Sequence, residues 1–272
     1  MSLTVKNTKD LIDPNRFKLK VLIYGLPGSG KSLWASQAPN PGIAACETGE
    51  GRGLLTVAQA GLEYVEPASL PDFEAVCAGQ VFKGKETIVI DSLSDMCKTF
   101  IKDYALTIPR KQGDSPRRQL GVPELDDYGT MGELTRRLLR KVLALDKHIV
   151  VTATLRIDRP DAETGVGDFT IGPDLPGQMF LGSTAMFDSV FCLLTRPALR
   201  DPKDAKSRYT QRILLTENDG TRLAKCRSVL DNRPLLEREI VWDLGSGAGG
   251  FMDILGRITK RYAEMLGRKN GT

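Results

Sequence analysis

Short apolar runs along the chain alternate with stretches in which apolar residues recur every three or four positions. The first pattern predicts buried strands and the second predicts amphipathic helices. We expect strands over residues 20–25, 42–46, 86–91 and 148–155, and helices over residues 31–38, 71–82, 93–105 and 127–145. Strands that alternate with helices favour a mostly parallel sheet with helices on both faces.

The pattern changes after residue 187, where strands follow one another without helices. The runs DSVFCLL, QRILLTE and TRLAKCRSVL predict an antiparallel extension of the same sheet, and residues 251–266 return to helical spacing. We therefore predict an α/β fold in three parts. These are an N-terminal tail or edge element (1–19), a core (20–244), and a glycine hinge with a C-terminal amphipathic helix (245–272).

Composition narrows the class of protein. The chain has 272 residues, of which 41% are hydrophobic and 26% are charged, values typical of a globular protein. A net charge of +4 is too small to imply a nucleic-acid partner unless the charge is clustered. The five cysteines form no C-x-x-C pair, which indicates reduced thiols, and no apolar run approaches a membrane span. We expect a cytoplasmic protein (host cytoplasm if phage-encoded) without a membrane partner.

The stretch GLPGSGKS matches G-x-x-x-x-G-K-[ST] and lies between a predicted strand and a predicted helix. In this motif the backbone N–H groups surround phosphate oxygens at a helix N-terminus. Lys31 would reach the β- and γ-phosphates, and the Ser32 hydroxyl would bind Mg²⁺. The expected nucleotide-binding residues are Gly25, Leu26, Pro27, Gly28, Ser29, Gly30, Lys31, Ser32 and Leu33. The expected cofactors are ATP and Mg²⁺.

Three further residues stand at or near the ends of predicted strands, where ligands lie in open α/β sheets. Asp91 ends TIVID and would hold magnesium through water. Glu47 follows the second strand and is our candidate for the base that orients water, with Glu50 as a competing candidate. Thr154 would sense the phosphate if its strand lies beside that of Asp91.

The order of these motifs resembles the RecA-like P-loop NTPase core. The similarity runs from about Lys20 to Pro234 and is greatest to compact phage-type ATPases, some of which act in recombination or strand annealing. RecA itself has a glutamine where this chain has Thr154, so the family's route from phosphate to DNA may differ here. RecA-like and KaiC-like proteins also carry a late K-x-R or K-x-K pair that enters the neighbouring subunit's site. The resemblance gives that role to Lys225 and Arg227 in a homo-oligomer, ring or filament, although basic residues on a solvated edge strand are the alternative.

Two loops are candidates for contact with single-stranded DNA. Residues 108–119 include Arg110, Lys111, Arg117 and Arg118. Residues 156–183 occupy the position of the RecA-type DNA loops by resemblance, but they also hold several acidic residues. Binding to the DNA backbone there would be independent of sequence and sensitive to salt. A single-strand-binding or replication protein is a further possible partner.

A second glycine loop, DLGSGAGGF (243–251), fits G-x-G-x-x-G through Gly245, Gly247 and Gly250. Such a loop normally opens a βαβ unit, whereas here one helix remains before the end of the sequence. We therefore interpret it as a flexible hinge and not as a methyl-donor site.

Together these features predict a Mg-ATP-hydrolysing, DNA-linked ATPase of the phage recombinase type, with sites completed between subunits. Two alternatives stay open. One is a nucleotide-dependent protein loader or clamp, and the other is a small-molecule kinase. The pair Lys225 and Arg227 argues against the kinase, because kinases usually supply such charges from their own lid.

Overall fold

The computed structural model describes residues 7–47, 52–109, 113, 115–159, 169–176, 179–226 and 234–267. Within them, one sheet has the strand order β10-β8-β7-β1-β5-β4-β2-β3, with β6 paired to β5 and β9 paired to β7. The strands are β1 (Lys20–Gly25), β2 (Pro41–Ala45), β3 (Glu63–Val65), β4 (Thr87–Asp91), β5 (His148–Asp158), β6 (Thr170–Pro173), β7 (Ser189–Leu199), β8 (Arg208–Leu215), β9 (Lys225–Cys226) and β10 (Glu239–Trp242).

The strands from β7 to β3 in this order are parallel, whereas β8, β9 and β10 run antiparallel to their neighbours. This confirms the expected fold class, a mostly parallel sheet with an antiparallel extension. The parallel strands end at one common edge, where Gly25 pairs with Thr154 and Leu193. We refer to it as the carboxyl edge.

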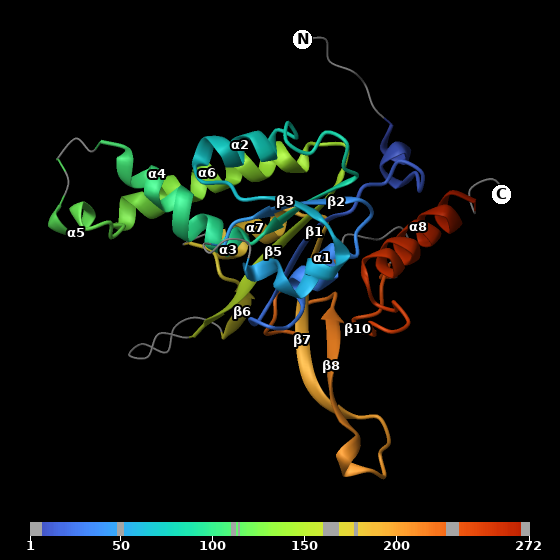
Figure 1. Cartoon of the computed structure of the whole chain (residues 1–272). Coiled ribbons are helices and arrows are strands. Elements are labelled where there is room, and N and C mark those ends of the chain that lie inside the picture. The colour runs from blue at the N-terminus through green and yellow to red at the C-terminus, as the bar shows by residue number, and fades with distance from the viewer. Residues whose placement is uncertain are drawn as a thin grey trace.

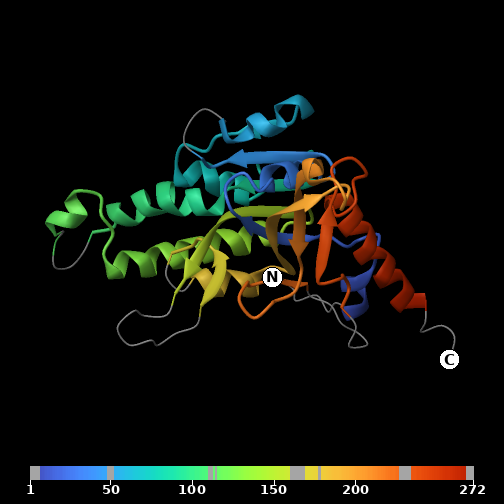
Figure 2. The same ribbon diagram turned by 90° about the horizontal axis from the view of Figure 1, so that it is seen from below.

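Helices cover both faces of the sheet (Figures 1 and 2). The helices are α1 (Lys31–Ser36), α2 (Leu70–Cys77), α3 (Leu93–Met96), α4 (Lys102–Thr107), α5 (Pro116–Gln119), α6 (Leu125–Leu143), α7 (Met179–Met186) and α8 (Phe251–Gly267). A π-helical turn, Cys97–Ile101, joins α3 to α4, so the helix predicted over 93–105 is continuous.

The alternation of side chains along each strand divides the core into two layers. Leu22 and Tyr24 of β1 pack in the layer under α2, α6 and α7. Val21 and Ile23 pack in the layer under α1 and α8. The C-terminal helix is therefore part of the second core layer, which also receives Trp34 from α1.

Some elements were not predicted. The strand β3 is only three residues long and partly exposed, so it has little apolar pattern. The strand β6 lies in the stretch 156–183 that we expected to be a loop, and the helix α7 begins within it. The strands β7 and β8 are longer than their apolar runs and extend from the body as a hairpin (Figure 1).

The other global expectations concern cysteines and membranes. All five cysteines are free thiols, and four of them are buried. Among the described residues no group of His, Cys, Asp or Glu forms a metal cluster. No described helix is both long and apolar enough to cross a bilayer.

Candidate nucleotide site

The glycine loop after β1 has the conformation that its sequence predicts. Gly28 and Gly30 have φ angles of +76° and +106°, a region that side-chain-bearing residues rarely adopt. Gly30 is the N-cap of α1 and supplies no side-chain acceptor to the first turn. The N–H groups at the start of α1 therefore face the loop without a capping partner and suit phosphate oxygens.

Lys31 points back into this loop. Its Nζ donates to the carbonyl oxygens of Gly25 and Leu26, both at 3.1 Å, and the residue is 9% exposed. Burial lowers the pKa of Lys31, while the nearby carboxylates of Asp91 and Glu47 act in the opposite direction. A buried cation at the loop is the group that a polyphosphate requires.

Asp91 ends β4 at the carboxyl edge, between β5 and β2. The condition that we set for Thr154 is therefore met, because β5 lies beside the strand of Asp91, and β2, which precedes Glu47, lies on its other side. The Thr152 hydroxyl of β5 donates to Oδ1 of Asp91, and within the described part of the chain no hydrogen bond reaches Oδ2. Asp95, in the first turn of α3, adds another carboxylate to the same region.

Glu47 follows β2 and lies at the mouth of the site. Its Oε2 would be 2.2 Å from a Cβ added at Gly53, so the carboxylate rests against Gly53 and would have to shift if that residue carried a side chain. Partial burial, followed by the charges of Asp91 and Asp95, raises the pKa of Glu47, and Lys31 lowers it. A carboxylate with a raised pKa is better suited to accept a proton from water.

These residues share one cavity of about 290 Å³. Its lining includes Lys31, Ser32, Glu47, Asp91 and Thr154, so all five predicted residues lie around the same space. The Ser32 hydroxyl and the Asp91 carboxylate are oxygen donors of the kind that Mg²⁺ prefers. The cavity therefore fits a magnesium-bound nucleotide phosphate, with Lys31 near the carboxylates.

Thr154 connects this cavity to the neighbouring loop. Its N–H donates to Ser94 Oγ at 3.0 Å, and its hydroxyl lies 3.5 Å from Oδ2 of Asp174. Asp174 also pairs with Lys98. A change in the hydrogen bond of the Thr154 hydroxyl would thus affect the salt bridge between Asp174 and Lys98, which lies outside the cavity.

Sequence reasoning missed Arg212 of β8. Its Nε donates to the carbonyl of Ser29 at 3.1 Å, and its guanidinium lies 5.7 Å from the ring centroid of Trp242. Arg212 also lines the cavity and supplies a second cation from the same subunit. In the sequence, Arg212 is marked only by being an arginine within the apolar run QRILL. Nothing in the sequence indicates that β8 lies near the glycine loop after β1.

The structure separates Lys225 from its own subunit's cavity. Lys225 pairs with Val190 of β7, three residues before Leu193 at the carboxyl edge, and β9 then runs toward the opposite edge. Arg227 and Glu50 lie outside the described residues. The assignments of Lys225 and Arg227 to a neighbouring subunit, and of Glu50 as a competing base, stay predictions.

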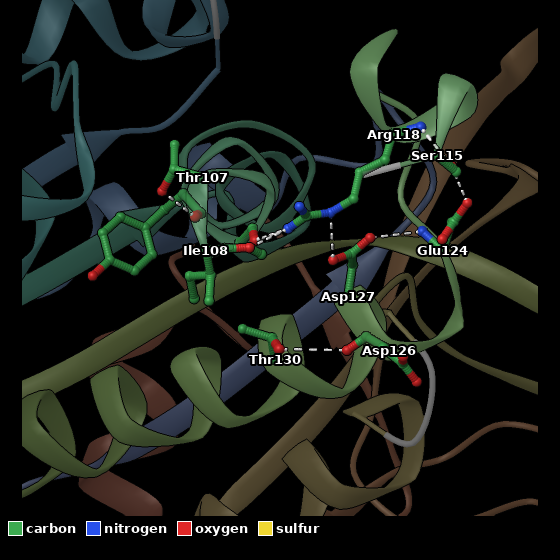
Figure 3. A network of polar contacts seen from close by, with 10 residues as sticks. Thr107, Ile108, Ser115, Arg118, Glu124, Asp126, Asp127 and Thr130 are labelled. Atoms are coloured by element: carbon green, nitrogen blue, oxygen red, sulfur yellow. Dashed lines mark hydrogen bonds and ion pairs between the residues drawn. The ribbon is translucent and has the colours of Figure 1, made fainter. Parts of the chain in front are cut away.

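Arg118, which we placed in the first candidate loop for DNA contact, requires a correction. Arg118 is 4% exposed and forms an ion pair with Asp127 through Nε at 3.2 Å (Figure 3). Its Nη2 also donates to the carbonyls of Ala105 and Ile108 at 3.0 and 2.7 Å. Arg118 therefore holds α5 against α4 and α6 and does not face solvent. Arg117 is exposed, whereas Arg110 and Lys111 lie outside the described residues.

The second candidate loop for DNA contact, residues 156–183, also holds an arginine that contacts the protein itself. Arg156 donates to Asp158 and to the carbonyl of Leu175, and lies over the Phe180 ring at 5.3 Å. Residues 160–168 and 177–178 lie outside the described part. Arg156 is thus engaged in contacts within the protein, whereas Arg159 is exposed.

The second glycine loop closes on itself. Oδ1 of Asp243 accepts from the N–H of Gly245, and Oδ2 of Asp253 accepts from the N–H of Gly249. The carbonyl of Gly249 accepts from Nε1 of Trp34 at 3.0 Å, so the loop packs on α1. We expected a flexible hinge, but this segment is a closed turn. It follows an antiparallel strand, which agrees with our rejection of a methyl-donor site.

Comparison with known proteins identifies the family of the chain. A family model described as an AAA domain matches residues 17–228. No curated protein sequence matches the chain. Among solved structures, flagellar accessory protein FlaH from Methanocaldococcus jannaschii is similar, with 11% identity, coverage of 88% of this chain and 93% of that chain, and a TM-score of 0.40. The KaiC-like protein PH0186 from Pyrococcus horikoshii OT3 has 14% identity, coverage of 84% and 86%, and a TM-score of 0.43.

Proposed function

The chain belongs to the AAA domain family of P-loop ATPases, and we propose that it hydrolyses Mg-ATP in a cycle linked to single-stranded DNA, in recombination or strand annealing of the phage type. The observation that carries the proposal is the meeting of Lys31, Ser32, Asp91 and Glu47 around one cavity at the carboxyl edge. This set provides a cation for phosphates, two oxygen donors for magnesium and a carboxylate for water.

The roles of the residues follow from their positions. Lys31 and the amides of the loop bind and orient the β- and γ-phosphates. Ser32 and Asp91 hold Mg²⁺, which neutralises charge on the phosphate oxygens when it is bound. Glu47 accepts a proton from the attacking water, and the hydroxyl of Thr154 changes partner when the γ-phosphate leaves.

The proposal also includes completion of the site between subunits. Lys225 lies away from its own cavity, which supports a role toward a neighbour's nucleotide. With Arg227 it would stabilise the charge that develops on the transferred phosphate. The assembly would be a ring or a filament.

The test is ATP turnover by the purified protein with and without single-stranded DNA. Stimulation by DNA is the expected result. Turnover that requires a small acceptor molecule would instead support a kinase, and turnover that responds only to a protein partner would support a loader or clamp. Absence of ATP hydrolysis in all three conditions would overturn the proposal.

A further inference from the structure

The strands β7 and β8 continue beyond the sheet as a two-stranded hairpin (Figure 1). The last residue of β7 paired to β1 is Leu193, and the last residue of β10 is Trp242, opposite Arg212. Beyond these pairs β7 and β8 contact each other from Arg196↔Gln211 to Leu199↔Arg208. We call residues 196–211 the arm.

The arm holds most of the chain's excess positive charge. Residues 196–211 contain five Lys or Arg residues and two Asp residues, a net charge of +3, whereas the whole chain has +4. The remaining 256 residues are thus almost neutral in sum. Positive charge is therefore clustered in the arm, although the net charge of +4 did not by itself imply such a cluster.

Three cations of the arm are available to a ligand. Lys203, Lys206 and Arg208 are exposed, and none forms an ion pair within the described part of the chain. The two aspartates of the arm do not neutralise them in direct pairs. Asp201 Oδ1 accepts from the N–H of Lys203 at 2.9 Å, and Asp204 Oδ1 accepts from that of Lys206 at 2.8 Å.

The side chains of the arm favour nucleic acid over other polyanions. The exposed Arg200 lies 5.7 Å from the ring centroid of the half-buried Tyr209, and the two side chains offer a stacking surface beside the cations. Aromatic and arginine surfaces next to flexible cations are typical of single-strand binding. The tip, DPKDAKS, has no large apolar residue that could enter a bilayer.

We propose that the arm binds the phosphate backbone of single-stranded DNA. The proposal rests on the DNA-linked function above and places the contact on a different surface from loops 108–119 and 156–183. The strand β8 also connects the arm to the glycine loop of the nucleotide cavity. It carries Arg208 at the arm and, four residues on, Arg212, which contacts Ser29 of the glycine loop.

The experiment compares two triple variants that each remove three positive charges. The arm variant is Lys203→Gln, Lys206→Gln and Arg208→Gln, and the control is Lys9→Gln, Lys83→Gln and Lys260→Gln at exposed sites elsewhere. Binding of a labelled single-stranded oligonucleotide is measured by fluorescence anisotropy over a range of salt concentrations. Duplex DNA and polyglutamate serve as competitors, and ATP turnover is measured with and without DNA.

We expect the arm variant to reduce the slope of log affinity against log salt by about 2, since each lost contact to a single strand contributes about 0.7. At about 0.1 M salt this corresponds to a loss of about 100-fold in affinity. The control should retain most of its affinity. Turnover without DNA should be unchanged in both variants, while stimulation by DNA should be lost only in the arm variant.

The outcomes separate the two proposals. Equal affinity in the arm variant and the wild type would overturn the arm proposal and leave the DNA-linked function intact. Binding that depends on the arm without any stimulation of turnover would support the arm and overturn the linkage. A wild-type protein that binds no single strand would overturn both, and polyglutamate or duplex DNA competing as well as the single strand would overturn the ligand class.

Discussion

At the scale of single residues, Lys31 has the most direct part in the proposed chemistry. Its ammonium donates to the carbonyls of its own loop at Gly25 and Leu26 and to no other group in the described part of the chain, so its removal should leave the fold intact. We expect Lys31→Ala to abolish binding of ATP, because the phosphates lose their main cation. Titration calorimetry measures this, with Lys83→Ala as a control, and normal ATP affinity in Lys31→Ala would contradict the site.

Glu47 permits a test of hydrolysis separately from binding. Glu47→Gln keeps the shape of the side chain but removes the group that accepts a proton. We expect ATP affinity close to that of the wild type and turnover lower by a factor of roughly 10²–10⁴, the usual range for a general base. Wild-type turnover in this variant, measured by phosphate release, would require Glu50 or another group as the base.

The residues of the site differ in how far the sequence could predict them. Lys31 and Asp91 could be predicted because each belongs to a local pattern, a glycine loop or the end of an apolar strand. Thr152 and Arg212 could not, because their roles depend on which strands are neighbours. That Thr152 lies beside Asp91, and Arg212 beside Ser29, follows from tertiary pairing.

At the scale of elements, Arg118 and Asp127 join α5 to α6 through a buried ion pair (Figure 3). We expect Arg118→Met to lower the free energy of unfolding by about 3–5 kcal/mol, because it removes the cation that neutralises the buried charge of Asp127. The double variant with Asp127→Leu should recover part of the loss. Urea unfolding measures both, and a loss of DNA affinity without a loss of stability in Arg118→Met would restore Arg118 as a DNA contact.

A second junction of elements depends on His148, the only histidine in the chain. Its Nδ1 accepts from the N–H of Leu19 at 3.0 Å, and its ring lies 5.7 Å from that of Phe251 in α8. Burial, followed by the charges of Lys18 and Lys20, lowers the pKa of His148 from 6.5 to about 4. The folded protein thus binds this proton less readily than the unfolded chain.

Because the unfolded chain takes up the proton first, stability is complete above about pH 6.5 and is lost as the pH falls toward 4. We expect the free energy of unfolding to decrease by up to about 3 kcal/mol across this window. Denaturant unfolding at several pH values measures it, with His148→Asn as the control that should show a smaller decrease. Equal pH dependence in both proteins would contradict the assignment.

Elements with a strong apolar pattern could be predicted, and those without one could not. The strand β1 begins and ends where its apolar run does, and the long helix α6 begins two residues before the predicted start. The strand β3 and the outer parts of β7 and β8 lack such a pattern. Their hydrogen bonds come from a neighbouring strand, which only the folded chain provides.

At the scale of the whole molecule, the sheet has a nucleotide cavity at its carboxyl edge and Lys225 toward the other edge. If Lys225 and Arg227 act on a neighbour's nucleotide, an isolated subunit has an incomplete site. Specific ATPase activity should therefore rise with protein concentration until rings or filaments saturate. Arg227→Ala should bind ATP nearly normally, because Lys31 and Asp91 remain, while its turnover should fall by about 10³–10⁵.

Mixing Arg227→Ala with Glu47→Gln tests this arrangement most directly, because each variant lacks a different half of the site. A mixed assembly contains some junctions at which an intact Glu47 from one subunit meets an intact Arg227 from its neighbour. We expect activity to return in part on mixing, although each variant alone is almost inactive. Light scattering monitors assembly. The control is a mixture of Lys31→Ala and Glu47→Gln. Both of those changes lie in the same half of the site, so no junction in that mixture has two intact halves. Co-assembly without recovery would contradict the role in the neighbouring site, and so would a wild-type monomer whose specific rate does not depend on concentration.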